Sequence, residues 1–589
     1  MRRLFKRVNQ GVEMPKFKDI YQQELSKIKE QCKAFSKAHP NVAPMLEQNA
    51  TDPDVERLLE GFAYLSAQIQ EVIDDQIPEF SGGLIKKFFP HYLRPLPSAT
   101  IMAFTPKTEL SESFTVKKGT NFSSIPVDKT PCVFRLCSDC IVHPLVVESA
   151  RMVSHSGEQH YIELTIALSG VDLESWWVNQ LTFHLGGLFA EAAQLYYLLL
   201  RHVDKIELTN DHSTLTLPKH SITAAGFSDD EALLPYPAHA STAYRVLQEY
   251  FLMPQKYLYI TLDDLDKWSN RGESNAFKIR FFLNPQVKSI PTITKKSFVL
   301  NTAPAINLFD YDAKPITLDH QHYQYPIYPD TANKKHYEIY AVKQVIGYQQ
   351  GQAEPKNYVN IDDCSHHANK PCYEIINKSS VTTDGLDSYI SMLYNPNDNN
   401  AEQETLSILL ECSNGNLPEY LSKGDINVPT GNSPDLLSFE NLYVPTPYKT
   451  PPVEDEWMWR LQSMLNMNYL SIATAENLRE LLRFHLFLNK GRHITRSFSE
   501  RQIDSIEEIT VQSTNRMISG ILMQGQKIQL RCRVNDFSSK GEAFLFISVI
   551  DRFFATYIAM NTFTLLELTD AATGEQITWP IRIGEQLLN

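Results

Sequence analysis

The chain has 589 residues, of which 43% are hydrophobic, 11% aromatic and 21% charged, as in ordinary globular proteins. This composition excludes intrinsic disorder as the main state, and the length corresponds to about four domains. The formal net charge of −14 excludes binding to nucleic acid or anionic lipid through the bulk charge of the protein. Only 23 residues are glycine, which disfavours folds built on several glycine-rich phosphate loops.

The first part of the chain is predicted to be helical. Residues 1–13 show no periodic pattern, and we expect translation to begin at Met14. Phe17–Ala38 is amphipathic, and a second helix begins at Asp52, an N-cap residue followed by Pro53, and extends to Ile77. The apolar residues of this second helix follow a 3.6-residue period and form one stripe, which needs a partner. Six of them form the candidate partner interface: Val55, Leu58, Leu59, Phe62, Leu65 and Ile69.

The segment after the helices, Pro90–Ser98 (PHYLRPLPS), contains three prolines and predicts an extended connection. From Ala99 the sequence changes to short alternating runs typical of strands, with inserted helical segments. We therefore predict an α+β multidomain fold, with an N-terminal helical region followed by β-rich domains. The predicted regions are residues 1–98, 99–300, 301–455 and 456–589.

The two most apolar windows, Leu185–Val203 and Phe544–Met560, are predicted to be buried helices rather than membrane spans. Each contains charged residues, Glu191 and Arg201 in the first and Asp551-Arg552 in the second, which cost several kcal/mol in hydrocarbon. The N-terminus lacks the apolar core of a secretory signal, and eight cysteines in so long a chain do not indicate a disulfide framework. These features predict a cytoplasmic protein.

Two cysteine clusters have spacings found in metal sites. Cys132, Cys137, Cys140 and His143 match part of an iron–sulfur or zinc pattern, but the intervening residues indicate a strand rather than a loop. Cys364, His366, His367 and Cys372 surround a predicted exposed loop. We predict that neither cluster binds a metal, that the first consists of buried packing residues, and that the protein has no cofactor.

Sequence motifs of common enzyme classes are absent, including G-x-G-x-x-G, the P-loop, H-E-x-x-H and G-x-S-x-G. The alternatives that the residues leave open are a β-rich carbohydrate-active enzyme and a redox or metal protein. The first would use an acidic pair for glycoside cleavage and aromatic residues such as Trp176-Trp177 to stack sugars. The candidate acidic pairs are Asp74-Asp75, Asp263-Asp264 and Asp362-Asp363.

The most informative stretch of the sequence is Gly226–Ile260, which contains Gly226-Phe227, Leu233-Leu234-Pro235-Tyr236 and Leu247-Gln248-Glu249-Tyr250-Phe251. Further informative stretches are Asp52–Leu65, Pro90–Ser98, Ala303–Asp310, Glu411–Leu421, Trp459–Ile472, Arg552–Thr564 and Trp579–Gln586. Taken together and in order, these stretches resemble the TssF family, the baseplate wedge subunits of bacterial type VI secretion systems. Modest departures at Gly415-Asn416, Gln462 and Met467 concern packing and not activity, because the family has no catalytic residues.

The resemblance implies a structural assembly protein that is not an enzyme and has no catalytic, cofactor or metal residues. It implies two copies of TssF joined to one TssG, with further partners TssK, TssE and the spike hub protein VgrG. It implies a cytoplasmic baseplate that its partners dock at the inner face of the membrane, with no nucleic acid and no direct membrane insertion. We expect the Asp52–Ile77 helix to dock in a helical bundle shared with other wedge chains.

Overall fold

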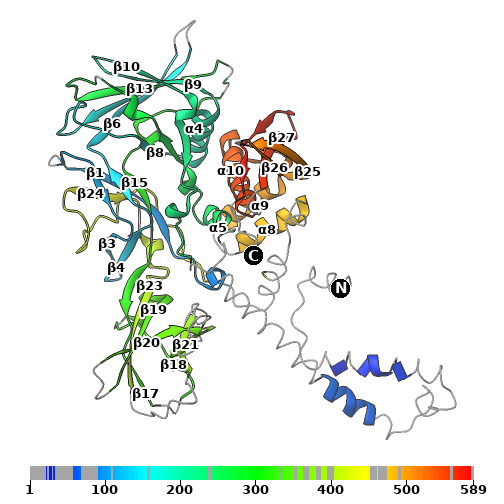
Figure 1. The fold of residues 1–589 in the computed structure, drawn as a ribbon. Coiled ribbons are helices and arrows are strands. Elements are labelled where there is room, and N and C mark those ends of the chain that lie inside the picture. Colours follow the sequence, from blue (N-terminus) through cyan, green and yellow to red (C-terminus); the bar gives the residue numbers. More distant parts are fainter. Residues whose placement is uncertain are drawn as a thin grey trace. The chain divides into compact units, whose positions relative to one another are not determined.

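The computed structural model describes residues 21–22, 25–29, 31–32 and 57–67 near the N-terminus and most of residues 90–584. The longest gaps in the second range are residues 362–370, 394–403, 451–460 and 462–473. The chain divides into two compact units, which we call unit 1 (Met1–Lys87 and Glu454–Ser463) and unit 2 (Phe88–Val453 and Met464–Asn589). Both are drawn in Figure 1.

The described residues of unit 1 are helical, at residues 21–22, 25–29, 31–32 and 57–67 and at Leu461. The segments before residue 68 lie inside helices that the sequence predicts, so the helical prediction is confirmed for them. Val55 and Ile69, two of the candidate interface residues, lie outside the described residues, as does the predicted start at Met14. The division into four regions stays a prediction.

The first sheet of unit 2 has the strand order β24-β1-β15-β4-β3, with antiparallel neighbours throughout. Its core is built on aromatic rings, such as Phe122 and Phe439, whose centroids lie 4.6 Å apart. A two-stranded ribbon, β2 with β5, contributes to the same core. The strands are β1 (Ala99–Pro106), β2 (Phe114–Val116), β3 (Asn121–Val127), β4 (Thr130–Leu136), β5 (Cys140–Val142), β15 (Thr302–Ile306) and β24 (Leu437–Asn441).

Two further antiparallel sheets lie between β5 and β15 in sequence, in the orders β10-β9-β13-β7-β6 and β11-β12-β8-β14. Two helices are inserted among them, α4 (Phe189–Arg201) and α5 (Arg245–Leu252). The strands of the first order are β6 (Leu145–Val153), β7 (Tyr161–Leu168), β9 (Val203–Thr209), β10 (Thr214–Pro218) and β13 (Ala276–Leu283). Those of the second are β8 (Leu181–Leu185), β11 (Ile222–Ala225), β12 (Tyr259–Leu262) and β14 (Phe298–Val299).

The next sheet has eight strands in the order β16-β23-β19-β20-β21-β22-β18, with β17 also paired to β23. It has a core of its own, centred on Leu318, Val345, Ile390 and Leu406. In Figure 1 the first sheet lies between this one and the sheet that contains β10 and β13. The strands are β16 (Phe309–Asp312), β17 (Ile316–Leu318), β18 (Tyr325–Pro326), β19 (Glu338–Gln349), β20 (Lys356–Asn360), β21 (Cys372–Ser379), β22 (Leu386–Leu393) and β23 (Glu404–Ser413).

The C-terminal part of unit 2 contains a sheet in the order β25-β26-β27-β28, with β29 also paired to β27. Strands β26 and β27 are parallel and are connected through α10. The elements are α8 (Ala475–Phe487), α9 (His493–Asp504), β25 (Ile506–Ile518), β26 (Ile521–Cys532), α10 (Lys540–Tyr557), β27 (Thr562–Asp570), β28 (Gln576–Thr578) and β29 (Arg582–Ile583).

Helix α10 explains why the Phe544–Met560 window is so apolar. It contacts α4 and α5 as well as β27, so residues from Ala543 to Ala555 are buried almost without interruption. A helix buried on all sides has no polar face. Asp551, at its middle, is fully buried and accepts a hydrogen bond from the Arg582 guanidinium. Each apolar window contains most of one largely buried helix, α4 in the first and α10 in the second, as predicted. In the described part of the chain no helix has the length and hydropathy of a membrane span.

The prediction of an extended connection over Pro90–Ser98 is wrong for its first four residues. Pro90–Leu93 forms a 3-10 helix, and the side chains of His91 and Tyr92 are buried. The fixed φ of proline suits the first turn of a helix as well as it suits an extended chain, so burial of the two rings decides the conformation. From Leu96, which pairs with Lys449, the chain is extended into β1. Otherwise the α+β multidomain prediction is confirmed.

Candidate functional site

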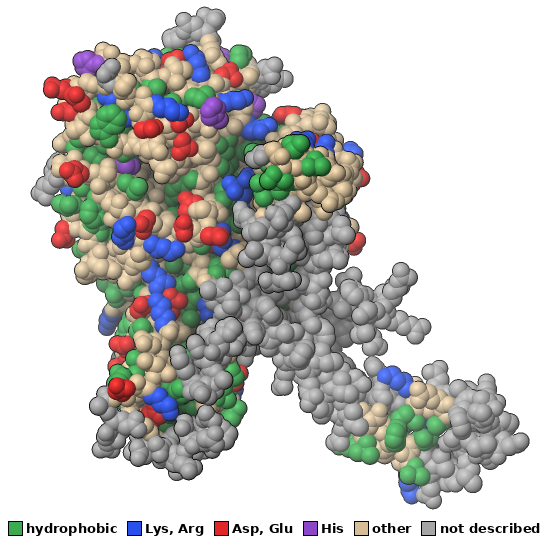
Figure 2. Space-filling model, in the orientation of Figure 1, with side chains coloured by type: hydrophobic (Ala, Val, Ile, Leu, Met, Phe, Trp, Pro, Cys, Tyr) green, Lys and Arg blue, Asp and Glu red, His purple; other side chains and the backbone are tan. Residues whose placement is uncertain are grey.

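The described helix at residues 57–67 exposes a stripe of large apolar side chains. Leu58, Phe62 and Leu65 are 73%, 64% and 57% exposed, and their i, i+4, i+7 spacing places them on one face. Figure 2 shows hydrophobic side chains grouped on the described helical segments of unit 1. An exposed apolar stripe of this kind is characteristic of a surface that binds another protein.

The same helix buries a second, narrower face. Ala63 and Ala67 are fully buried, and Leu59 is half-buried. Leu59 therefore lies at the border between the two faces rather than at the centre of the exposed stripe. The small side chains of Ala63 and Ala67 allow close packing on the buried face. The large apolar side chains of the stripe remain exposed to solvent.

A buried ion network organises the Gly226–Ile260 stretch. Glu249 and Lys256 are fully buried and form an ion pair, and Tyr257 donates a hydrogen bond to Glu249 over 3.3 Å. The other carboxylate oxygen of Glu249 accepts hydrogen bonds from the backbone N–H groups of Leu233 (2.8 Å) and Leu234 (3.2 Å). Glu249 thus connects α5 to the loop that precedes it.

Arg245, one turn before Glu249 on α5, secures the other end of this loop. Its guanidinium contacts Asp229 (2.6 Å) and the carbonyl oxygens of Phe227 and Ser228 (both 3.2 Å). At Gly226, φ is +92°, and a Cβ atom there would lie 2.6 Å from the Lys256 carbonyl oxygen. These contacts explain structurally why the motif contains a glycine, an arginine and a glutamate. The sequence does not identify the network, although the i, i+4 spacing of Arg245 and Glu249 is a signal for an ion pair.

The PHYL segment packs into a cluster of neutral rings with α8. His485 Nδ1 lies 2.9 Å from the Leu481 carbonyl, which can only accept, so His485 Nε2 accepts the hydrogen bond from the Tyr92 hydroxyl (2.9 Å). Burial lowers the pKa of His485 to about 4 and, with Arg94 nearby, that of His91 to about 3. The cluster therefore holds the start of unit 2 against α8 without any charge.

The Cys132, Cys137 and Cys140 thiols are buried, as predicted. Cys132 and Cys140 pack in the core of the first sheet, whereas Cys137 contacts the Leu233 carbonyl. Burial raises the pKa of the Cys137 and Cys140 thiols to about 12. In the second cluster Cys372 is disulfide-bonded, and the cluster's other members lie outside the described residues. Across the described residues no three potential ligands are grouped, and the absence of a metal stays a prediction.

The acidic pair of the carbohydrate-enzyme alternative that the structure describes, Asp263-Asp264, is not arranged as a catalytic pair. Asp263 accepts a hydrogen bond from Thr223, and Asp264 is paired with Lys267. The bonds from Lys267 and Ser221 lower the pKa of Asp264, whereas a general acid needs a raised one. The other two acidic pairs lie outside the described residues. Of the two tryptophans, Trp176 is buried against Phe277 and only Trp177 is exposed.

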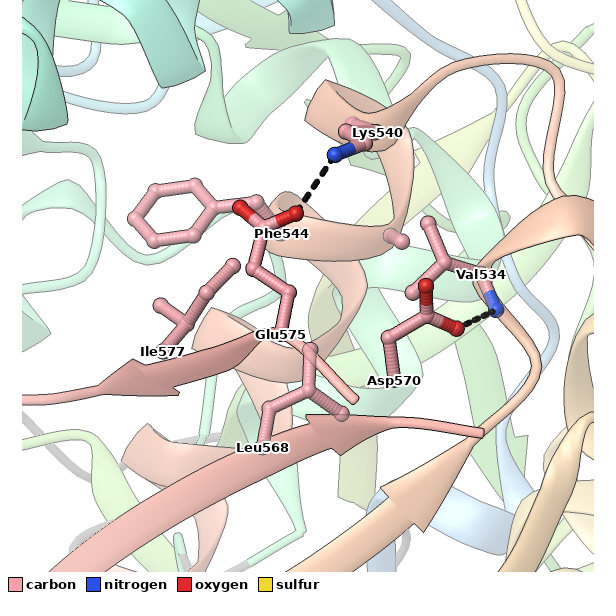
Figure 3. Close-up of a pocket in the computed structure, with 8 residues that line it drawn as sticks. Val534, Lys540, Phe544, Leu568, Asp570, Glu575 and Ile577 are labelled. Carbon is pink, nitrogen blue, oxygen red and sulfur yellow. Dashed lines mark hydrogen bonds and ion pairs between the residues drawn. The ribbon is translucent and has the colours of Figure 1, made fainter. Parts of the chain in front are cut away.

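A cavity between α10 and the C-terminal sheet is too small for a ligand. It has a volume of about 10 Å³, space for about one water molecule. Figure 3 shows its lining: Lys540 is paired with Glu575 at 2.6 Å, Asp570 accepts a hydrogen bond from the Val534 N–H at 3.4 Å, and Phe544, Leu568 and Ile577 complete the wall. All three charged side chains at the cavity already have partners within the protein.

Residues 13–586 match the model of a protein family described as type VI secretion system, TssF. The chain belongs to this family. TssF1, a type VI secretion system component of Pseudomonas aeruginosa, is 27% identical over 97% of this chain and 99% of its own length. The fold resembles a chain in the structure of a TssK-TssF-TssG baseplate subcomplex, with a TM-score of 0.76 and 25% identity over 91% of this chain and all of that one.

A chain of a second type VI secretion baseplate structure has the same fold, with a TM-score of 0.61 and 23% identity over 97% of this chain and all of that one. The order of motifs in the sequence therefore identified the family correctly. The protein is a TssF baseplate component of a type VI secretion system. The matches span nearly the whole chain, so they include the helical region of unit 1 as well as the sheets of unit 2.

Proposed function

We propose that this TssF protein is a structural wedge subunit, which assembles with TssG into the part of the baseplate that links the spike hub, the TssK adaptors and the contractile sheath. Membership of the family over residues 13–586 supports the assignment. The similar chain in the TssK-TssF-TssG subcomplex supports TssK and TssG as partners. The resemblance adds TssE, the spike protein VgrG and a second TssF copy, in a ratio of two TssF to one TssG.

The observation that carries this proposal in the chain itself is the apolar stripe of Leu58, Phe62 and Leu65. Large, permanent interfaces are apolar, like the core of a protein. Three exposed apolar side chains of this size on one helix face are typical of one side of such an interface. We propose that this stripe docks against TssG in a shared helical bundle. In the sequence, Val55 and Ile69 continue the same period, and we propose that they belong to the same interface, whereas Leu59 lies at the border of the stripe.

A wedge subunit of this kind acts by binding and not by catalysis. We propose that it has no cofactor and works in the cytoplasm, where its partners dock the baseplate at the membrane. Without TssG the stripe is an aggregation-prone patch, so the protein made alone should be poorly soluble and should become soluble when TssG is co-produced.

The test is a double substitution on the stripe, Leu58→Asp with Phe62→Asp. Burying two unpaired carboxylates costs several kcal/mol, so we expect co-purification with TssG to be lost. Glu60→Lys is the matched control, because Glu60 is exposed roughly opposite the stripe on the same helix and should leave the complex intact. Protease-resistant fragments beyond Ala99 report whether unit 2 still folds. A normal complex with the double variant would contradict the docking proposal.

A further inference from the structure

Strand β25 is a long edge strand. It pairs with β26 from Glu508↔Arg531 to Ile518↔Ile521, and in the described part of the chain β26 is its sheet neighbour on one side only. A strand of 13 residues with a free edge presents a row of backbone N–H and C=O groups that can pair with another strand. Native proteins usually cover or shorten such an edge.

The outer half of this hairpin is also unusually exposed. Ile506, where β25 begins, is fully buried, but Gln512, Ser513 and the residues from Asn515 to Met517 are exposed. The tip of the hairpin is apolar, with Met517, Ile521 and Leu522 at 70%, 66% and 68% exposure. Apolar side chains at an open strand end indicate a surface that is covered in the assembled protein.

The geometry of the hairpin fixes which residues face the free edge. Two residues separate the paired Ile518 and Ile521, so this pair is hydrogen-bonded, and such pairs alternate along an antiparallel ladder. Even-numbered residues of β25, such as Gln512, therefore direct their backbone groups toward β26. Odd-numbered residues from Ile509 to Met517 direct theirs outward.

We propose that β25 pairs with β25 of a second copy of the chain, antiparallel, about a two-fold axis at Gln512. In this register Glu508 of each copy lies opposite Arg516 of the other, so two ion pairs form at once, and Thr510 lies opposite Thr514. Glu508 and Arg516 are both exposed, and within the described part of the chain neither takes part in an ion pair. Identical surfaces related by a two-fold axis are the usual form of contact between like chains.

Neighbouring two-fold registers lack this complementarity. An axis at residue 511 would place Glu508 opposite Thr514, and an axis at residue 513 would place it opposite Ile518. In the proposed register the even-numbered residues occupy the non-hydrogen-bonded positions between the copies, where opposing side chains are closest. The charge pattern and the free backbone groups therefore favour the same alignment.

The inference rests on the proposed function in one respect, that the assembly contains more than one copy of this chain. Gln512→Cys tests it in the full-length protein co-produced with TssG. The two copies of residue 512 face each other across the axis at a separation suited to a disulfide, so mild oxidation should convert the chain into a covalent dimer. Gln576→Cys, exposed on β28 at the opposite edge of the same sheet, and the unsubstituted chain should stay monomeric under denaturing electrophoresis.

A mixture of two variants tests the register. Thr510→Cys and Thr514→Cys should each cross-link poorly alone and efficiently when the two tagged chains are co-produced. An intact TssG complex with no dimer from Gln512→Cys would overturn the inference and leave the proposed function standing. Loss of the TssG complex in the unsubstituted protein would instead contradict the proposed function.

Charge reversal tests the ion pairs independently, in the chain that carries Gln512→Cys. Glu508→Arg and Arg516→Glu each replace two attractive pairs by two repulsive ones, so each should slow cross-linking through the introduced thiol by about tenfold at low salt. The double variant restores opposite charges and should recover the rate of the chain without charge changes. Equal rates for all four chains would overturn the proposed register.

Discussion

At the scale of single residues, Glu249 has a structural role in its motif, as a buried and fully paired carboxylate. One of its carboxylate oxygens is paired with Lys256, and the other accepts two backbone hydrogen bonds from the loop before α5. Both oxygens therefore have partners, and the contacts fix the position of the loop relative to the helix. A buried charge whose partner is removed is far more costly than an exposed one. The network is therefore a structural requirement of the stretch that is most diagnostic of the family.

We predict that Glu249→Gln lowers the free energy of unfolding by about 3 kcal/mol, because it leaves Lys256 buried without its counter-ion. Adding Lys256→Met should recover part of the loss. Glu575→Gln removes an ion pair to a half-exposed lysine and should cost less than about 1 kcal/mol. Thermal unfolding of the TssG complex measures the stability of all three variant proteins. Equal losses for Glu249→Gln and Glu575→Gln would contradict the prediction.

At the scale of elements, the packing of α10 on α4 depends on a close approach at Gly541. A Cβ atom there would overlap the backbone of Ala193, and the Gly541 N–H donates a hydrogen bond to the Gln194 side chain at 2.9 Å. Helices pack this closely only where one of them lacks a side chain.

We predict that Gly541→Ala destabilises unit 2 by about 1–3 kcal/mol through overpacking, despite the better helix propensity of alanine. Gly61→Ala is the matched control, since its Cβ would meet nothing within 4 Å and should stabilise its helix by up to about 1 kcal/mol. Differential scanning calorimetry compares them, and a stabilised Gly541→Ala protein would show that the two helices are not in close contact.

Sequence patterns were reliable for elements with strong periodicity and weak for those set by tertiary packing. Tyr161–Leu168 alternates and is a strand with those same bounds, and the apolar window after Leu185 contains α4. Helix α5 was missed because it has only eight residues, which is too few for its apolar side chains to establish a helical period. Strand β25 was missed because it is a mostly polar edge strand. Without a buried face, its sequence lacks the alternation of apolar and polar residues that indicates a strand.

The candidate site was predictable only in part. The apolar period identified the stripe on the helix at residues 57–67, but not that Leu59 lies at its border, because the side on which the rest of the unit packs is decided by tertiary structure. The hairpin tip has a local signal in the sequence, the pair Ser519-Gly520 between apolar residues, which is typical of a two-residue turn.

At the scale of the whole molecule, unit 2 buries several histidines in their neutral form. Burial lowers the pKa of His91 and His184 to about 3 and that of His143 and His485 to about 4. The unfolded chain binds protons at these residues from about pH 6.5 downward, and the folded protein does not. Stability is therefore lost as the pH falls below about 6.5.

We predict that the melting temperature falls between pH 7 and pH 5, with each of these histidines contributing up to about 2 kcal/mol at pH 5. Glu338, whose pKa burial raises to about 7, acts in the opposite direction and offsets part of the loss. His184→Gln should reduce the slope of stability against pH in this range. A slope unchanged by that substitution, measured in the TssG complex, would show that His184 does not contribute.

The contact between α4 and α10 also has a consequence for synthesis on the ribosome. At about 5–20 residues per second, α10 emerges about 20–70 s after α4, and until then the face of α4 that α10 covers has no partner. Until its last residues have been synthesised, the nascent chain therefore exposes an apolar face of α4, to which chaperones can bind. A prematurely terminated chain never completes this face, and it should be degraded rather than incorporated into a baseplate.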